Sequence, residues 1–84
     1  MKNYTRTYMR HFGYRIAEDF KCELTGSPAH DIHHIDGRGK GKDTIENLMA
    51  VTREVHADIH DRNRYTKEQL REVHQRFMKN NKKK

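Results

Sequence analysis

The chain reads Asp31-Ile32-His33-His34-Ile35 and, after an asparagine at position 47, His56-Ala57-Asp58-Ile59-His60. Four of its seven histidines therefore fall between residues 33 and 60. Imidazole is the side chain best suited to hold a metal ion or to move a proton near neutral pH. In a small basic protein, such a cluster predicts chemistry on a polyanion, or at least binding of one.

The spacing of these histidines divides them between two tasks. On a helix, His56 and His60 would lie on one face, about 6 Å apart, a spacing found in many zinc sites. Neighbours on a strand point to opposite faces, so one histidine of the 33–34 pair can face a metal ion while the other stays free as a general base. Hydrolysis of a phosphodiester uses both functions. The alternative is a chance histidine pair on a solvated helix.

The first half of the chain predicts one helix and one strand. Tyr4, Tyr8 and Phe12 recur at four-residue spacing, which indicates a short amphipathic helix that Gly13 can end. We expect this aromatic stripe to be core more than a platform for stacked bases. Residues 29–35 are predicted to form a strand, in which Ile32 and Ile35 break strict alternation, as a bulged strand can.

The second half predicts a strand and two helices. Leu48-Met49-Ala50-Val51 is an apolar run typical of a strand. Thr52 can cap a helix that continues to about Asp61, with Val55 and Ile59 on its buried face. A capping box at 66–69 begins the last helix. The predicted order is helix, strand, strand, helix, helix, in one α+β domain over residues 1–84.

Composition limits the class of protein. With 84 residues, of which 32% are hydrophobic, the chain makes one small domain for which a metal ion can be a useful brace. Cys22 is the only cysteine, so no disulfide can form within the chain. No apolar run reaches the roughly 20 residues of a membrane span, and no apolar stretch follows the basic residues at the N-terminus as in a signal peptide.

The net charge of +6 is concentrated at the two ends of the chain. Residues 1–15 carry four basic side chains and no acid, and residues 79–84 carry four lysines. Basic ends of this kind can bind a phosphate backbone. The lysines also fit a disordered, solubilising tail over about 80–84.

The order His33-His34, Asn47-Leu48, His56-x3-His60 resembles the HNH nucleases. The resemblance covers about residues 20–62 and implies a ββα-metal (His-Me finger) core of two strands and one helix around a single divalent ion, with flanking helices. It also implies that the chain is a metal-dependent DNA endonuclease. Small proteins of this family are frequent in bacteria and phages, so the resemblance implies activity in the bacterial cytoplasm. The products would carry 5′-phosphate and 3′-hydroxyl ends.

The resemblance also implies a role for each matching residue. His33, His56 and His60 would bind the metal ion, and His34 would be the general base toward water. Asn47 would hold the loop that orients His34, and Asp31 would help to orient the site. Candidates for contact with substrate phosphates are the basic residues Arg38, Lys40, Lys42 and Arg53.

One departure from the family concerns cysteines. Many relatives hold a structural zinc with two Cys-x-x-Cys pairs, and the matching positions here are Cys22, Thr25, Thr52 and Val55. Three of the four thiolates are missing, so Cys22 is interpreted as a packing residue. Folding should then depend on the flanking helices and on the ion of the histidine site.

The identity of the ion and of the partners stays open at the level of sequence. Three imidazoles suit zinc, nickel or manganese better than magnesium, although magnesium can still support activity. The expected partner is DNA, with a dimer or a protein partner for any strong specificity. A second hypothesis is a non-catalytic, zinc-stapled module that binds nucleic acid. A third is a small subunit whose basic ends dock on an acidic protein.

Overall fold

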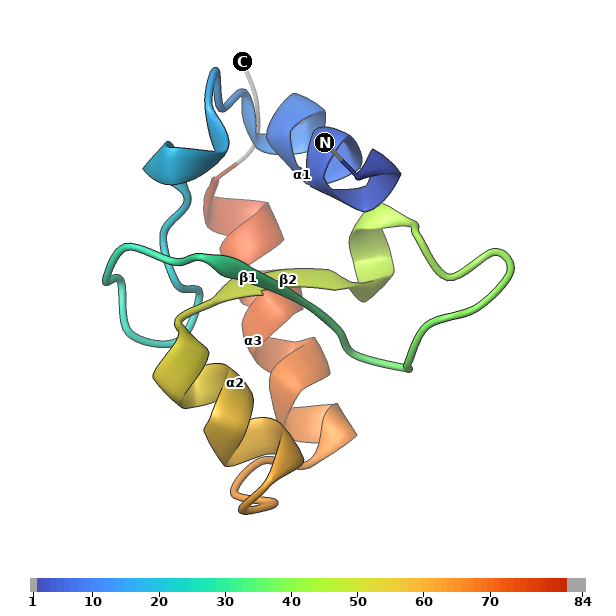
Figure 1. Ribbon diagram of the computed structural model, residues 1–84, viewed down its shortest axis with the longest axis vertical. Helices are drawn as coiled ribbons and strands as arrows, with labels where there is room; N and C mark the ends of the chain where they lie inside the picture. The colour runs from blue at the N-terminus through green and yellow to red at the C-terminus, as the bar shows by residue number, and fades with distance from the viewer. Residues whose placement is uncertain (1, 82–84) are drawn as a thin grey trace.

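A computed structural model describes residues 2–81 of the chain, and its architecture is α+β (Figure 1). Within these residues, three α-helices accompany a two-stranded antiparallel sheet. The order of elements is the predicted one: α1 (Asn3–Phe12), β1 (Asp31–His34), β2 (Leu48–Val51), α2 (Arg53–His60) and α3 (Lys67–Asn80). Two 3-10 turns, Ala17–Asp19 and Ile45–Asn47, precede the two strands.

The sheet is regular and shorter than expected on its first strand. Residue pairs run from Asp31 opposite Val51 to His34 opposite Leu48, without an extra residue on either side. The strand predicted over 29–35 is therefore confirmed for residues 31–34, whereas its outer residues lie outside the strand and the expected bulge is absent. Its ends make other contacts: the Ala29 amide donates to the Phe20 carbonyl, and the Ile35 amide donates to the Asn47 carbonyl. Ile35 breaks the alternation because it lies past the end of β1.

Helix α2 follows β2 with a single intervening residue, Thr52. The Thr52 hydroxyl accepts from the Val55 amide at 3.0 Å, as a helix N-cap does. Val55 and Ile59 are buried, as predicted. Because residues four apart share a helix face, this anchorage fixes the direction in which His56 and His60 point.

The two outer helices also follow their sequence signals. Gly13, with φ of 77°, ends α1 in the left-handed conformation that glycine adopts easily. Thr66 and Gln69 form the predicted capping box of α3. Helix α3 runs behind the sheet in Figure 1 and extends through Asn80, where the disordered tail was expected to begin. The lysines at 82–84 lie outside the described residues.

The core contains a buried polar network beside its apolar side chains. The Glu23 carboxylate accepts from the Tyr8 hydroxyl at 2.5 Å and lies 2.7 Å from Nδ1 of His74. The side chains of Glu23 and His74 are 0% and 1% exposed. Nε2 of His74 lies 2.6 Å from the Ile45 carbonyl. Cys22, adjacent to Glu23, is buried in the core as a packing residue would be.

No helix within residues 2–81 combines the length and the apolar composition that a membrane crossing requires.

Candidate metal centre

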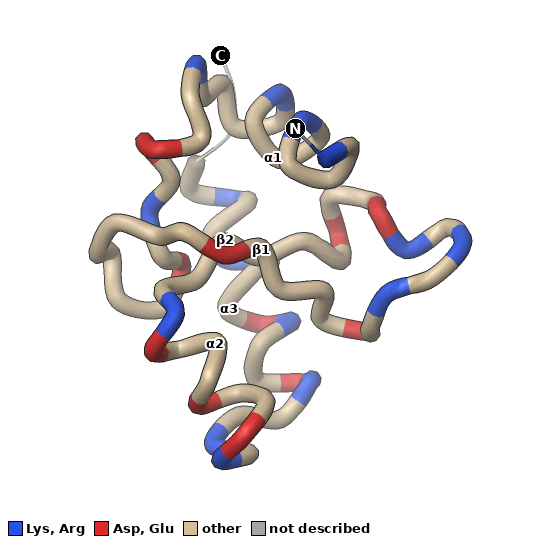
Figure 2. Tube along the Cα trace, in the orientation of Figure 1, with Lys and Arg blue, Asp and Glu red and all other residues tan. Residues whose placement is uncertain are grey.

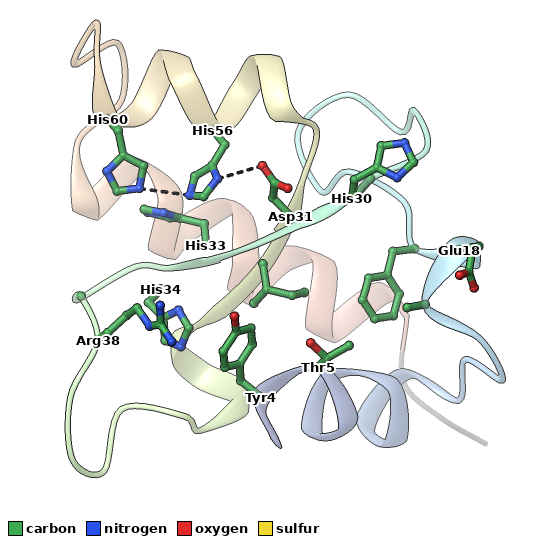
Figure 3. Close-up of a pocket in the computed structure, with 15 residues that line it drawn as sticks. Tyr4, Thr5, Glu18, His30, Asp31, His33, His34, Arg38, His56 and His60 are labelled. Carbon is green, nitrogen blue, oxygen red and sulfur yellow. Dashed lines mark hydrogen bonds and ion pairs between the residues drawn. The ribbon is translucent and has the colours of Figure 1, made fainter. Parts of the chain in front are cut away.

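Three histidines from two elements converge on one point (Figure 3). His33 on β1 and His56 and His60 on α2 each offer a ring nitrogen, and these nitrogens all lie within 4.8 Å of one another. The three ring centroids are 4.6–5.3 Å apart. The distances are short enough for one metal ion to be bound by all three. The structure thus brings together the three residues predicted as metal ligands.

Asp31 fixes the orientation of His56. Its Oδ2 lies 3.0 Å from Nδ1 of His56. A carboxylate only accepts, so Nδ1 carries the proton and Nε2 keeps its lone pair. That Nε2 lies 3.0 Å from Nε2 of His60. A carboxylate behind a ligating imidazole is the usual support of a metal-binding histidine.

His33 has the properties of a neutral metal ligand. It is 5% exposed, and its Nδ1 is buried with no hydrogen-bond partner among the described residues. Burial, followed by the nearby imidazoles, lowers the pKa of His33 to about 4. The ring is therefore uncharged at neutral pH and keeps a lone pair. An unpartnered buried nitrogen beside two further imidazoles fits a borderline-soft cation such as zinc or nickel.

His34 lies on the other side of β1, as strand alternation predicts (Figure 3). Its Nε2 lies 2.8 Å from Oδ1 of Asp43, and its ring meets that of Tyr4 edge-on at 4.8 Å. His34 takes no part in the three-histidine cluster. Of the 33–34 pair, His33 is therefore the candidate metal ligand and His34 is available as a general base.

Asn47 spans the loop that connects β1 to β2. Its Oδ1 accepts from the Asp36 amide at 2.6 Å, and its Nδ2 donates to the carbonyls of Gly37 and Lys42 at 3.1 and 2.8 Å. Asn47 is 6% exposed, so these bonds are largely shielded from water. The contacts are those expected of a residue that holds this loop in shape.

A cleft of about 720 Å³ contains both histidine environments. His33, His56 and His60 line it on one side of β1, and His34, Tyr4 and Arg38 line it on the other (Figure 3). A substrate in the cleft would therefore meet a metal-binding cluster and a separate imidazole.

The predicted phosphate contacts divide between this cleft and other surfaces. Arg38 lines the cleft, with its guanidinium 5.4 Å from the centre of the Tyr4 ring. Lys40 and Lys42 do not line it, and Lys42 borders a different cavity, next to α3. Arg53 is 82% exposed, with its Nε 3.9 Å from Asp31. Of these four residues, Arg38 is the one placed within the cleft.

Sequence reasoning missed two neighbours of His34. Asp43 was not singled out, because nothing in the 37–43 segment indicates that the loop folds back to β1. Tyr4 was interpreted as core; it is partly buried and also forms a wall of the cleft. The sequence signal that could have indicated Asp43 is its position as an acidic residue directly after the glycine-rich segment 37–42.

Comparisons of this chain with protein-family models, with curated proteins and with solved structures give no match. The function therefore rests on the chemistry of the residues in the cleft.

Proposed function

We propose that this chain is a metal-dependent endonuclease that hydrolyses DNA phosphodiester bonds. In this proposal β1, β2 and α2 form a ββα-metal core, as in the HNH nucleases that the sequence resembles. The observation that carries it is the division of one histidine pair: His33 faces the three-histidine cluster, while His34 lies across β1 in the same cleft. A site for binding a metal alone has no use for the second environment.

His33, His56 and His60 would hold one divalent ion, with Asp31 supporting His56. When bound, such an ion supplies positive charge that stabilises the phosphate oxygens and the leaving group. The cluster offers three imidazole nitrogens as ligands, which favours zinc, nickel or manganese over magnesium. Magnesium remains among the ions to be tested because the resemblance implies it.

His34 would take the proton of the attacking water. His34 lines the cleft on the Tyr4 side of β1, with Nε2 bonded to Asp43, and the loop beside it is held by Asn47. Arg38 would contact a substrate phosphate from its place over Tyr4. Basic residues on α1 and along the loop after β1 would attract the DNA backbone (Figure 2).

A second candidate function uses the same cluster without catalysis. A zinc-stapled module that binds nucleic acid would need His33, His56 and His60 but not a free His34. The exposed basic loop over 36–44 and the positive net charge suit both functions. The role of His34 therefore separates them.

The test is nicking of supercoiled plasmid DNA with magnesium, manganese, nickel or zinc. We expect nicking with at least one of these ions and a loss of about 100-fold or more in His34→Ala, the usual contribution of a general base. Binding of the metal and of DNA should be unchanged in this variant, because His34 lies outside the cluster.

His30→Ala is the matched control. His30 is an exposed histidine that lines the same cleft outside both groups, so its removal should leave the nicking rate near that of the wild type. A wild-type protein that nicks DNA with none of the four ions would contradict the nuclease and favour the binding module. Equal nicking by His34→Ala and the wild type would remove His34 from the reaction.

A further inference from the structure

His34 forms a hydrogen bond with Asp43, an acidic residue that has no role in the predicted site. Oδ1 of Asp43 lies 2.8 Å from Nε2 of His34. We propose that Asp43 is a positioning residue that holds His34 through Nε2 and leaves Nδ1 as the atom that accepts a proton. The use of this atom in catalysis rests on the proposed nuclease function; the assignment of the hydrogen bond does not.

The direction of the hydrogen bond follows from the chemistry of the two groups. An ionised carboxylate has no proton to donate, so Nε2 of His34 must be the donor. A neutral imidazole carries one proton, and placing it on Nε2 leaves the lone pair on Nδ1. The side chain of His34 is 4% exposed, so an Nε2–H without an acceptor would be costly there. Asp43 thereby fixes both the tautomer and the rotation of the ring.

Asp43 is itself held in place by Asn47. The Lys42 carbonyl, which belongs to the peptide bond leading into Asp43, accepts from Nδ2 of Asn47 at 2.8 Å. At the other end, Asn47 precedes Leu48, the residue opposite His34 in the sheet. His34 contacts Asp43, the Lys42–Asp43 peptide contacts Asn47, and Asn47 is bonded to Leu48, which lies opposite His34. These contacts form a closed path. This closed path gives a physical route by which Asn47 acts on His34.

Tyr4, the aromatic neighbour of His34, cannot replace Asp43. Tyr4 contacts the imidazole ring edge-on, with centroids 4.8 Å apart, and this contact restrains the position of the ring more than the choice of tautomer. Asp43 has a 51% exposed side chain, so holding it against His34 requires the loop geometry described above. An exposed acid with no such role would be free to turn toward water.

The first measurement is a ¹H–¹⁵N NMR spectrum of the histidine side chains at about pH 9, well above the ordinary pKa of imidazole. It is made on the full chain with added zinc and without DNA. We expect His34 to carry its proton on Nε2, protected from exchange with water, and to lose this protection in Asp43→Ala. A proton on Nδ1, or an unchanged Nε2–H signal in Asp43→Ala, would overturn the proposal.

The second measurement compares single-turnover nicking rates and DNA affinities. We expect Asp43→Ala to cleave about 10- to 100-fold more slowly, a part of the general-base contribution. Its DNA affinity should be equal or higher, since a negative charge is removed. Asp43→Asn, which keeps an acceptor oxygen, should recover part of the rate. Glu46→Ala, an exposed acid nearby whose removal changes the charge equally, is the control and should match the wild type.

The two measurements separate the possible failures. If the wild type does not nick DNA, the nuclease proposal fails, and the spectrum alone still decides whether Asp43 holds Nε2. If the wild type nicks DNA but Asp43→Ala is as fast, Asp43 does not position the reacting histidine.

Discussion

The imidazole of His33 is unusual among the buried groups of this protein, because Nδ1 has no hydrogen-bond partner within the described residues. Leaving a buried polar atom unpaired costs about 1–3 kcal/mol. The same burial lowers the pKa to about 4 and keeps the ring neutral. Both effects prepare the nitrogen for a cation, which would offset the cost when bound.

Asp31 gives a prediction at the scale of one residue. Its carboxylate accepts from Nδ1 of His56, so Asp31→Ala should weaken metal binding about 10- to 100-fold, as loss of such a support usually does. Metal affinity can be measured by competition with a chromogenic chelator. Asp19→Ala, which removes an exposed acid from the 17–19 turn, should bind the metal like the wild type. Equal affinities for Asp31→Ala and the wild type would show that Asp31 does not support the ligand.

The three-histidine cluster could be predicted because its signals are local. His56 and His60 are four residues apart on a helix with a recognisable cap, and His33 belongs to an adjacent pair on a strand. Asp43 could not be predicted in the same way. Its contact with His34 depends on the path of a loop, which is set by the bonds of Asn47 and by the ion pair of Asp36 with Arg71 on α3.

At the scale of elements, Glu23 and His74 join parts of the chain that carry no local signal for one another. The carboxylate of Glu23 lies between Tyr8 of α1 and His74 of α3, and Oε2 is 3.4 Å from the Ala50 amide of β2. The two flanking helices are thereby tied to the sheet. Helix caps and apolar runs were predicted correctly because they involve neighbouring residues, whereas this network joins residues up to 51 positions apart.

The network predicts non-additive effects on stability. His74→Leu leaves a buried carboxylate without its partner and should lower the free energy of unfolding by about 3–5 kcal/mol. Adding Glu23→Gln removes the buried charge and keeps an acceptor for Tyr8, so the double variant should be more stable than His74→Leu. Urea denaturation of the single and double variants measures this coupling. Additive losses would contradict a coupled buried pair.

The same pair predicts a dependence of stability on pH. Burial alone lowers the pKa of His74, but the hydrogen bond and charge of Glu23, the Ile45 carbonyl and the charge of Glu46 raise it above its ordinary value. The contribution to stability is thus full below about pH 6.5, the value for the unfolded chain, and is lost as the pH rises through the higher folded value. The stability difference between the wild type and the double variant should shrink over this range. A constant difference would contradict a charged His74.

At the scale of the whole molecule, the short sheet and the three helices found within residues 2–81 must stabilise a chain of 84 residues. Domains of this size have small cores, and a bound ion adds stability in proportion to the logarithm of its concentration. The polar network around Glu23 lies beside Cys22, which is buried in the core. We infer that the polar network and an ion bound at the three-histidine site would both contribute to the stability of this fold.

Removal of the metal should therefore lower the melting temperature. At a free-ion concentration of 100 times Kd, binding adds about 2.7 kcal/mol, which corresponds to several degrees in a domain of this size. The measurement is a thermal melt of demonstrably metal-loaded protein with and without excess chelator. His60→Ala should melt at the same temperature in both conditions. An unchanged melt of the loaded wild type would contradict a stabilising ion.

The most direct test of the division of labour among the histidines is a calorimetric titration with nickel in the absence of DNA. We predict one ion per chain for the wild type and for His34→Ala, with equal affinity, and binding about 100-fold weaker for His60→Ala. Absence of binding by the wild type, or a loss of affinity in His34→Ala as large as that in His60→Ala, would contradict the separation of a three-histidine metal site from His34.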